Sequence, residues 1–122
     1  MVKGKRVNKL QNGWSFVDIF MSKGMSIFES ILFRMNINEI HVQPVIFSKS
    51  FLKLLENAPN DFLLDLYIMV IAKKKKIPIY RFPVIFNKKG RIYGTPNNST
   101  FFSKVNSAIK HVKSSVTNFY KW

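Results

Sequence analysis

The chain has 122 residues, enough for one domain, and 47% of them are hydrophobic, which excludes a largely disordered chain. It has no cysteine, which excludes disulfides, cysteine zinc sites and a cysteine nucleophile and fits a reducing compartment, while its two histidines, His41 and His111, lack metal-ligand spacing. The net charge of +14, from 20 Lys and Arg against 6 Asp and Glu, favours polyanionic partners such as nucleic acid, anionic lipid or a phosphorylated substrate.

The first part of the chain predicts a short strand followed by a long amphipathic helix. Residues 1–6 are mixed and basic and fit the end of a strand. Over 14–35, polar residues recur every three or four positions, as in a helix with a narrow polar stripe and a wide apolar face. Asp18, Lys23 and Glu29 lie inside this helix, and each would cost about 2.5–3.5 kcal/mol near the centre of a bilayer. We therefore expect a helix that is buried or lies in a membrane interface.

The rest of the chain predicts a mixture of strands and helices. In order, these are an edge strand or extended loop at 39–47, a helix at 50–57, a helix at 62–75, a strand at 77–86, a turn-rich basic connection at 87–100 and a helix at 101–120. Ser48 and Asp61 are placed to cap the helices at 50–57 and 62–75. The apolar residues of the last helix gather on one side. The order indicates an α/β fold with long amphipathic helices and too few strands for a self-sufficient sheet.

Two carboxylates, Asp61 and Asp65, are four residues apart and are expected on one face of the helix at 62–75. Like charges at this spacing slightly destabilise a helix, so the presence of each carboxylate needs an explanation. Asp61 has one as an N-cap beside the positive end of the helix dipole. Asp65 lies a full turn further, among apolar neighbours, and either faces solvent or points into a site. The spacing by itself favours the solvent-facing alternative.

Two basic segments are candidates for anion binding. Lys73–Lys76 closes a helix, where a solvated last turn that complements the helix dipole is the favoured interpretation. The loop at 87–95 combines two glycines, three cations and a hydroxyl, and it can wrap a phosphate through Arg91, Thr95 and backbone N–H groups. Basic loops are common, so composition leaves this loop undecided between a phosphate site and a solvated connection.

Seven short motifs then occur in one order along nearly the whole chain. They are Gly-Lys-Arg at 4–6, Gly-Met-Ser at 24–26, Ile-His-Val-Gln-Pro at 40–44 with Phe47, Asp-Phe-Leu-Leu-Asp-Leu-Tyr at 61–67, Ala-Lys-Lys at 72–74, Arg-Phe-Pro-Val at 81–84 and Arg-Ile-Tyr-Gly-Thr at 91–95. Together they resemble the second half of family 2 glycosyltransferases, in the branch similar to dolichyl-phosphate mannose synthases and bacterial polyprenyl-phosphate sugar transferases. The resemblance implies the C-terminal part of a GT-A (Rossmann-like) fold, in which the first half binds the nucleotide and the second half binds the acceptor.

The resemblance also implies roles for particular residues. Asp65 matches the acceptor-side carboxylate, which serves as a general base or orients the acceptor. A phosphate acceptor is already ionised at neutral pH, so orientation is the expected role. Arg6, and Arg91 with Thr95, match positions that contact the phosphates of the sugar nucleotide or lipid, and Gln43 lies in the segment that lines the sugar pocket. With this resemblance the expectation for Asp65 changes from a solvated side chain to a site residue.

The chain also departs from the pattern of this family. It contains no Asp-x-Asp motif to hold Mg²⁺ or Mn²⁺ against a diphosphate, so we expect no metal site here and assign the metal to the full-length enzyme. His41 and Val42, and the segment 96–98, differ from the residues that relatives often carry. We therefore expect 1–122 to be a single partial domain, the acceptor-side half, which is inactive alone and is completed by donor-half sequence or by a partner chain.

The expected substrates are a nucleotide-sugar and a phosphorylated or lipid-linked acceptor, such as a polyprenyl phosphate. The expected location is the cytoplasm, with peripheral contact at the cytoplasmic face of the membrane. The alternative is a small basic module that binds nucleic acid or anionic membrane without catalysis. Nucleic acid is the less favoured partner, because the chain has no RNP-like strand, no helix-turn-helix with a basic recognition face and no zinc frame.

Overall fold

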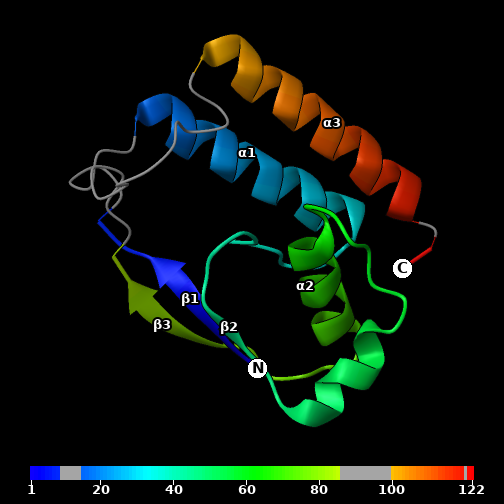
Figure 1. Ribbon diagram of the computed structural model, residues 1–122. Helices are drawn as coiled ribbons and strands as arrows, with labels where there is room; N and C mark the ends of the chain where they lie inside the picture. Colours follow the sequence, from blue (N-terminus) through cyan, green and yellow to red (C-terminus); the bar gives the residue numbers. More distant parts are fainter. Residues whose placement is uncertain (9–14, 86–99, 120) are drawn as a thin grey trace.

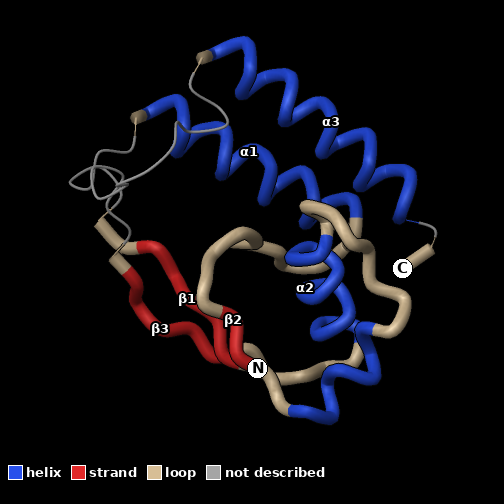
Figure 2. The backbone as a smooth tube through the Cα atoms, viewed as in Figure 1, coloured by secondary structure: helices blue, strands red, loops and turns tan. Residues whose placement is uncertain are grey.

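The computed structural model describes residues 1–8, 15–85, 100–119 and 121–122 (Figure 1). The strands in this part of the chain are β1 (Val2–Arg6), β2 (Val45–Ile46) and β3 (Tyr80–Val84), and the helices are α1 (Phe16–Leu32), the 3₁₀ helix η1 (Lys49–Leu55), α2 (Leu64–Lys74) and α3 (Phe101–Phe119). The strands lie together at one side of the molecule, and α1 and α3 run next to each other along the opposite side (Figure 2). The mixed α/β class expected from the order of elements is confirmed.

The sheet has the order β2-β1-β3, with β1 in the middle. β1 pairs in parallel with β3, from Val2 opposite Tyr80 to Arg6 opposite Val84, and antiparallel with β2. The carboxyl ends of β1 and β3 therefore lie at the same edge, where Arg6 is placed. The strand expected at 1–6 is confirmed, the strand expected at 77–86 is shorter, and the segment 39–47 forms only the two-residue edge strand β2 after a series of turns.

Helix α2 joins the two hydrophobic clusters of the described structure. Its buried residues are Leu66, Tyr67, Ile68, Met69, Val70 and Ala72. Leu66 and Val70 pack into a cluster with Phe33 from the end of α1. Ile68 and Ala72 pack into a second cluster with residues from η1 and the segment before β3. The residues 66–72 between Asp65 and Lys73 are apolar around the helix, so this part of α2 belongs in the core.

The start of α2 corrects the expectation for Asp61. The helix begins at Leu64, so Asp61 precedes it and does not share a helix face with Asp65. The backbone N–H of Leu63 donates to Oδ1 of Asp61 over 2.9 Å, which closes the turn that enters the helix. The prediction that Asp61 is the N-cap of this helix is therefore wrong, because Leu63 occupies that position and Asp61 closes the turn before it.

The end of α2 has the hydrogen bonds of a Schellman motif. The Ile77 N–H donates to the Ala72 carbonyl over 2.8 Å, and the Lys76 N–H donates to the Lys73 carbonyl over 3.0 Å. Lys76 has a φ of 53°, a conformation in which glycine is the usual residue at this position. Lys73–Lys76 are exposed, in agreement with the favoured interpretation that they form a solvated last turn.

The helix expected at 50–57 is a 3₁₀ helix instead. Ser48 occupies the N-cap position, but it makes no side-chain capping bond, because its hydroxyl lies 2.8 Å from that of Ser50. The Tyr67 hydroxyl donates to the Leu54 carbonyl over 3.1 Å and fixes this short helix against α2. Packing and this bond, rather than capping, therefore determine the conformation of the segment.

Helices α1 and α3 pack through their polar sides. Lys104 and Asp18 form an ion pair of 2.7 Å, and the buried Glu29 carboxylate contacts Nε2 of His111 and, at 3.4 Å, the hydroxyl of Ser115. The apolar stripes point outward: Phe16, Phe20, Ile27 and Ile31 on α1 and Phe102, Ile109 and Val116 on α3 are 45–84% exposed. Of the two alternatives expected for the first helix, buried or lying in a membrane interface, the buried one is therefore wrong for these residues, because fixed polar pairs occupy the helix contact.

None of the helices in the described residues is both long enough and apolar enough to cross a membrane.

Candidate functional site

Asp65 and Gln43, which the resemblance places in one site, are hydrogen-bonded to each other. Nε2 of Gln43 donates to Oδ1 of Asp65 over 3.2 Å, and Nδ1 of His41 lies 3.3 Å from the other carboxylate oxygen. The side chain of Asp65 is 22% exposed. Asp65 is therefore not a freely solvated residue on a helix surface. It extends from the buried helix α2 and is held by two side chains from the segment 38–44, which we call the site segment.

Two arginines hold the site segment against the sheet. Arg81 donates through Nη2 to the Asn38 carbonyl over 2.8 Å and to its Oδ1 over 3.1 Å, and through Nη1 to the Gly4 carbonyl over 3.1 Å. Arg6 donates through Nη2 to the His41 carbonyl over 3.0 Å. Burial lowers the pKa of both guanidinium groups, and the negative charge of Glu39 opposes this effect. Arg6, expected to contact a phosphate, thus also supports the backbone of His41.

Gly4 permits the closest approach of the site segment to β1. The Gly4 N–H donates to the Pro44 carbonyl over 3.1 Å. A Cβ atom at Gly4 would lie 2.8 Å from the carbonyl oxygen of Gln43 and 3.0 Å from a methyl group of Val42. Only glycine leaves room for this backbone contact, and the contact sets the position from which Gln43 reaches Asp65.

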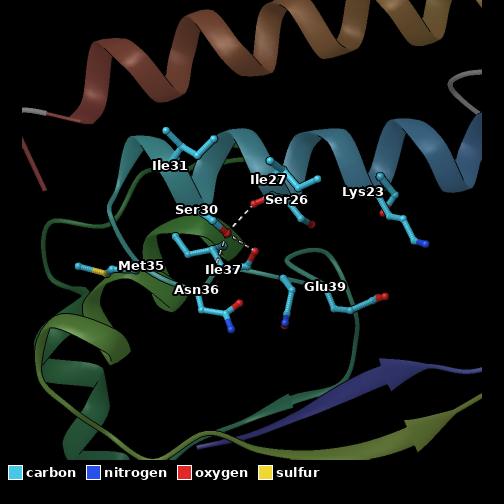
Figure 3. Close-up of a pocket in the computed structure, with 11 residues that line it drawn as sticks. Lys23, Ser26, Ile27, Ser30, Ile31, Met35, Asn36, Ile37 and Glu39 are labelled. Carbon is cyan, nitrogen blue, oxygen red and sulfur yellow. Dashed lines mark hydrogen bonds between the residues drawn. The ribbon is translucent and has the colours of Figure 1, made fainter.

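Ser30 fixes the start of the site segment from α1. Its hydroxyl accepts a hydrogen bond from the Ile37 N–H over 2.9 Å and lies 2.8 Å from the Ile37 carbonyl and 2.6 Å from the Ser26 carbonyl. Figure 3 shows these contacts among the residues that line a cavity of about 560 Å³, which include Lys23 and Ile27. The hydroxyl thus connects α1 directly to the segment that carries His41 and Gln43.

The charge on Asp65 is set by opposing effects. Burial raises the pKa of its carboxyl group, but the hydrogen bond with His41, the positive charge of Lys3 and the hydrogen bond from Gln43 together outweigh burial, so the pKa is lowered. Asp65 is therefore a carboxylate at neutral pH and a weak proton acceptor. Such a group is better suited to orient a ligand by accepting hydrogen bonds than to remove a proton.

Lys3 is the buried cation beneath this site. It lies on the middle strand, has no exposed surface, and its Nζ has no hydrogen-bond partner among the described residues. Burial lowers the pKa of its ammonium group to about 8, although the negative charge of Asp65 acts in the opposite direction. No sequence pattern indicates this buried position, because a lysine in a short basic strand is normally solvated.

A second cavity, of about 290 Å³, adjoins His41 and lies between α1, α3 and the site segment. Its lining residues are Arg6, Asp18, Met21, Ser22, Met25, Ser26, Glu39, Ile40, His41, Val42, Lys104, Ser107, Ala108 and His111. The rings of His41 and His111 meet edge to face with centroids 5.4 Å apart, so the two histidines are neighbours although they are distant in sequence. His111 is far in sequence from both His41 and Glu29, so no sequence pattern predicts its contacts with them.

The predicted site is thus brought together in part. Arg6, Gln43 and Asp65 lie around His41, whereas Arg91 and Thr95 lie outside the described residues. Among the residues that the structure describes, no group of three or more His, Cys, Asp or Glu side chains is arranged to hold a metal ion.

Comparisons of the chain with protein-family models, with curated proteins and with solved structures gave no match. The resemblance to family 2 glycosyltransferases therefore rests on the seven ordered sequence motifs.

Proposed function

We propose that this chain is the acceptor-side part of a glycosyltransferase with a GT-A fold, which transfers a sugar from a nucleotide-sugar to an acceptor at the cytoplasmic face of a membrane. One observation supports the proposal most directly. Arg6, Gln43 and Asp65 belong to three separate segments, were singled out by ordered motifs, and are linked by hydrogen bonds of 3.0–3.3 Å. Arg6 donates to the His41 carbonyl, and the side chains of His41 and Gln43 both contact the Asp65 carboxylate. A surface carboxylate of α2 would not require such a set of partners.

In this proposal Asp65 orients the acceptor. Its lowered pKa keeps it ionised, and its two oxygens are held by Gln43 and His41. A carboxylate fixed in this way accepts hydrogen bonds from a ligand in a defined direction, which is the positioning that transfer between two substrates requires. Arg6 and Arg81 hold the backbone of the site segment, so they maintain the geometry of the site from beneath.

The metal of such an enzyme belongs to the donor part. Mg²⁺ or Mn²⁺ neutralises the leaving diphosphate and requires carboxylate ligands. Asp65 is already engaged with a histidine and an amide, and among the described residues no group of three or more His, Cys, Asp or Glu side chains is arranged to hold a metal ion. In this proposal the metal ligands come from the donor part, and we expect activity only with that part present.

The proposal is tested by supplying that donor part. The reading frame upstream of the codon for Met1 is expected to encode a strand that ends in Asp-x-Asp, and its product is co-expressed with this chain. Sugar transfer is measured with radiolabelled nucleotide-sugars, Mn²⁺, and both lipid-linked and soluble acceptors. We expect Asp65→Asn to lower kcat about 10²-fold, the loss typical of a misplaced substrate. Asp61→Asn is the matched control and should retain activity, because asparagine also closes the turn.

Two results would contradict the proposal. The first is an upstream frame without Asp-x-Asp, together with no transfer in the co-expressed sample. The second is full activity of the Asp65→Asn enzyme, because the carboxylate would then have no part in transfer.

A specific surface supports peripheral binding to an anionic membrane as part of this function. On α3, Phe102, Ile109 and Val116 are 84%, 60% and 45% exposed and form one stripe, with exposed Lys110 and Lys113 on the same outer side. Apolar residues beside lysines are typical of helices that lie in the headgroup region, where each lysine contributes about 1 kcal/mol.

This surface is tested by co-sedimentation with lipid vesicles. We expect binding to vesicles rich in anionic phospholipid, weaker binding to neutral vesicles, and loss of binding for Phe102→Asp. Ile46→Asp is the matched control, because Ile46 is also exposed, at 58%, but lies on β2 at the sheet. Equal binding of the two variants would refute the assignment of α3 as the membrane surface.

A further inference from the structure

The cavity of about 290 Å³ beside His41 has the size of a site for a small molecule. Pockets for small molecules measure roughly 300–1,000 Å³, so this one is at the lower end and suits a ligand no larger than one sugar ring. Its walls come from α1, α3 and the site segment, and the ring of His41 connects it to Asp65. It therefore lies beside the residues that carry the proposed function.

The charged groups in the wall of this cavity balance each other. Arg6 and Lys104 contribute two positive charges, and Asp18 and Glu39 contribute two negative charges. Lys104 is paired with Asp18 at 2.7 Å, and Arg6 donates to the His41 carbonyl over 3.0 Å. The wall of this cavity thus carries no net charge, although the whole chain has a net charge of +14. A phosphate here would meet cations that are already engaged and two carboxylates that repel it.

The remaining lining suits an uncharged ligand with hydroxyl groups. Ser22, Ser26 and Ser107 bring hydroxyls that both donate and accept hydrogen bonds. Met21, Met25 and Ala108 are among the residues that provide apolar surface between them. Ser26 and Glu39, both labelled in Figure 3, line this cavity as well as the larger one. Donors and acceptors that alternate with apolar patches match a sugar ring, which has hydroxyls on its edge and C–H groups on its faces.

We infer that this cavity binds an uncharged sugar unit, so that the acceptor bound against His41, the partner of Asp65, is a sugar and not a phosphate group. That the bound sugar is the acceptor rests on the proposed function. The binding of a sugar in this cavity does not depend on it. It narrows the acceptor classes left open by the sequence, because a polyprenyl phosphate would have to place its charged group against a wall without net charge.

The test uses the whole chain and ligand-observed NMR. The probes are D-glucose, D-galactose, D-mannose and N-acetyl-D-glucosamine, with inorganic phosphate and glycerol 3-phosphate as competitors. We expect saturation transfer to at least one sugar and no displacement by either phosphate. Ala108→Leu places a larger side chain in the cavity and should weaken sugar binding by about tenfold or more. Asn106→Leu, at an exposed position of the same helix, is the control and should bind like the unmodified protein.

The outcomes separate this inference from the proposed function. If phosphate binds and sugars do not, or if neither binds, the sugar site is refuted, while the transfer assay with Asp65→Asn still decides the function. If sugars bind with the expected response to Ala108→Leu but the co-expressed protein transfers nothing, the cavity assignment stands and the transferase proposal fails.

Discussion

Replacing Lys3 by methionine tests the electrostatics beneath Asp65. Lys3 has no exposed surface, and its pKa falls from an ordinary value of 10.5 to about 8. Each pKa unit corresponds to about 1.4 kcal/mol, so the charged form of Lys3 costs the folded protein at most about 3 kcal/mol. Methionine has a similar length and no charge, and it removes this cost. We expect Lys3→Met to stabilise the protein at pH 7 by about 1–3 kcal/mol, because water entry and relaxation reduce the full figure.

The pH dependence of the unfolding free energy tests the direction of this effect independently. The pKa of Lys3 is lower in the folded protein than in the unfolded chain, so between about pH 8 and pH 10.5 the unfolded chain holds a proton that the folded protein has lost. The free energy of unfolding contributed by Lys3 therefore rises with pH across this window and is constant below it. Lys3→Met removes this rise, so the difference in stability between the two proteins should shrink as the pH increases.

The measurement is urea unfolding followed by circular dichroism at several pH values from 7 to above 10. Lys5→Met is the matched control, because Lys5 lies on the same strand but is exposed, and its substitution leaves the contribution of Lys3 unchanged. The reasoning is refuted if Lys3→Met destabilises the protein at pH 7, or if its stability follows the same pH curve as that of Lys5→Met.

Three further substitutions test the positioning of the site. Gly4→Ala forces the backbone of Gln43 away from β1, so we expect a loss of about 1–3 kcal/mol in unfolding free energy and weaker protection of the site segment in hydrogen exchange. Ser30→Ala leaves the Ile37 N–H without its partner and should cost about 1–3 kcal/mol in urea unfolding. Lys76→Gly relieves a positive φ and should raise the unfolding free energy by about 1 kcal/mol, measured in the same way.

Each of these three substitutions has a control at another residue of the same type. Gly24→Ala meets no atom within 4 Å and lies inside α1, so it should stabilise the helix where Gly4→Ala destabilises the protein. Ser22→Ala should cost less than Ser30→Ala. Lys73→Gly, inside the last turn of α2, should destabilise by about 1 kcal/mol, and a gain there would contradict the explanation for Lys76→Gly.

The regular elements of this chain were largely predictable, because each depends on a local pattern. The period of three to four residues located α1 and α3, and a run of apolar residues before and after Asp65 located α2. The ends of α1 and α2 differ from the prediction by one to three residues, and for α2 the difference reflects the local turns at Asp61 and Lys76. The 3₁₀ helix η1 was expected as an α-helix because its conformation depends on packing against Tyr67, which no local pattern encodes.

The orientation of the helices was not predictable in the same way. An amphipathic pattern normally indicates that the apolar side is buried, yet α1 and α3 contact each other through Asp18, Glu29, Lys104 and His111. These pairs join residues that are 82 or more positions apart in sequence, so no local spacing identifies them. The same limit applies to the site: ordered motifs identified Asp65, Gln43 and Arg6, but Lys3 and His111 were recognised only through contacts in three dimensions.

The placement of Asp65 on α2 determines which side of the site is able to adjust. Residues of its helix pack into both hydrophobic clusters, so a displacement of the α2 backbone would disturb the core. Gln43 and His41 are held differently, by hydrogen bonds on a segment of turns, and both side chains are exposed. In the proposed site, a ligand would therefore meet a carboxylate on a helix held by the core and two partners on the site segment, and that segment would carry the structural response to binding.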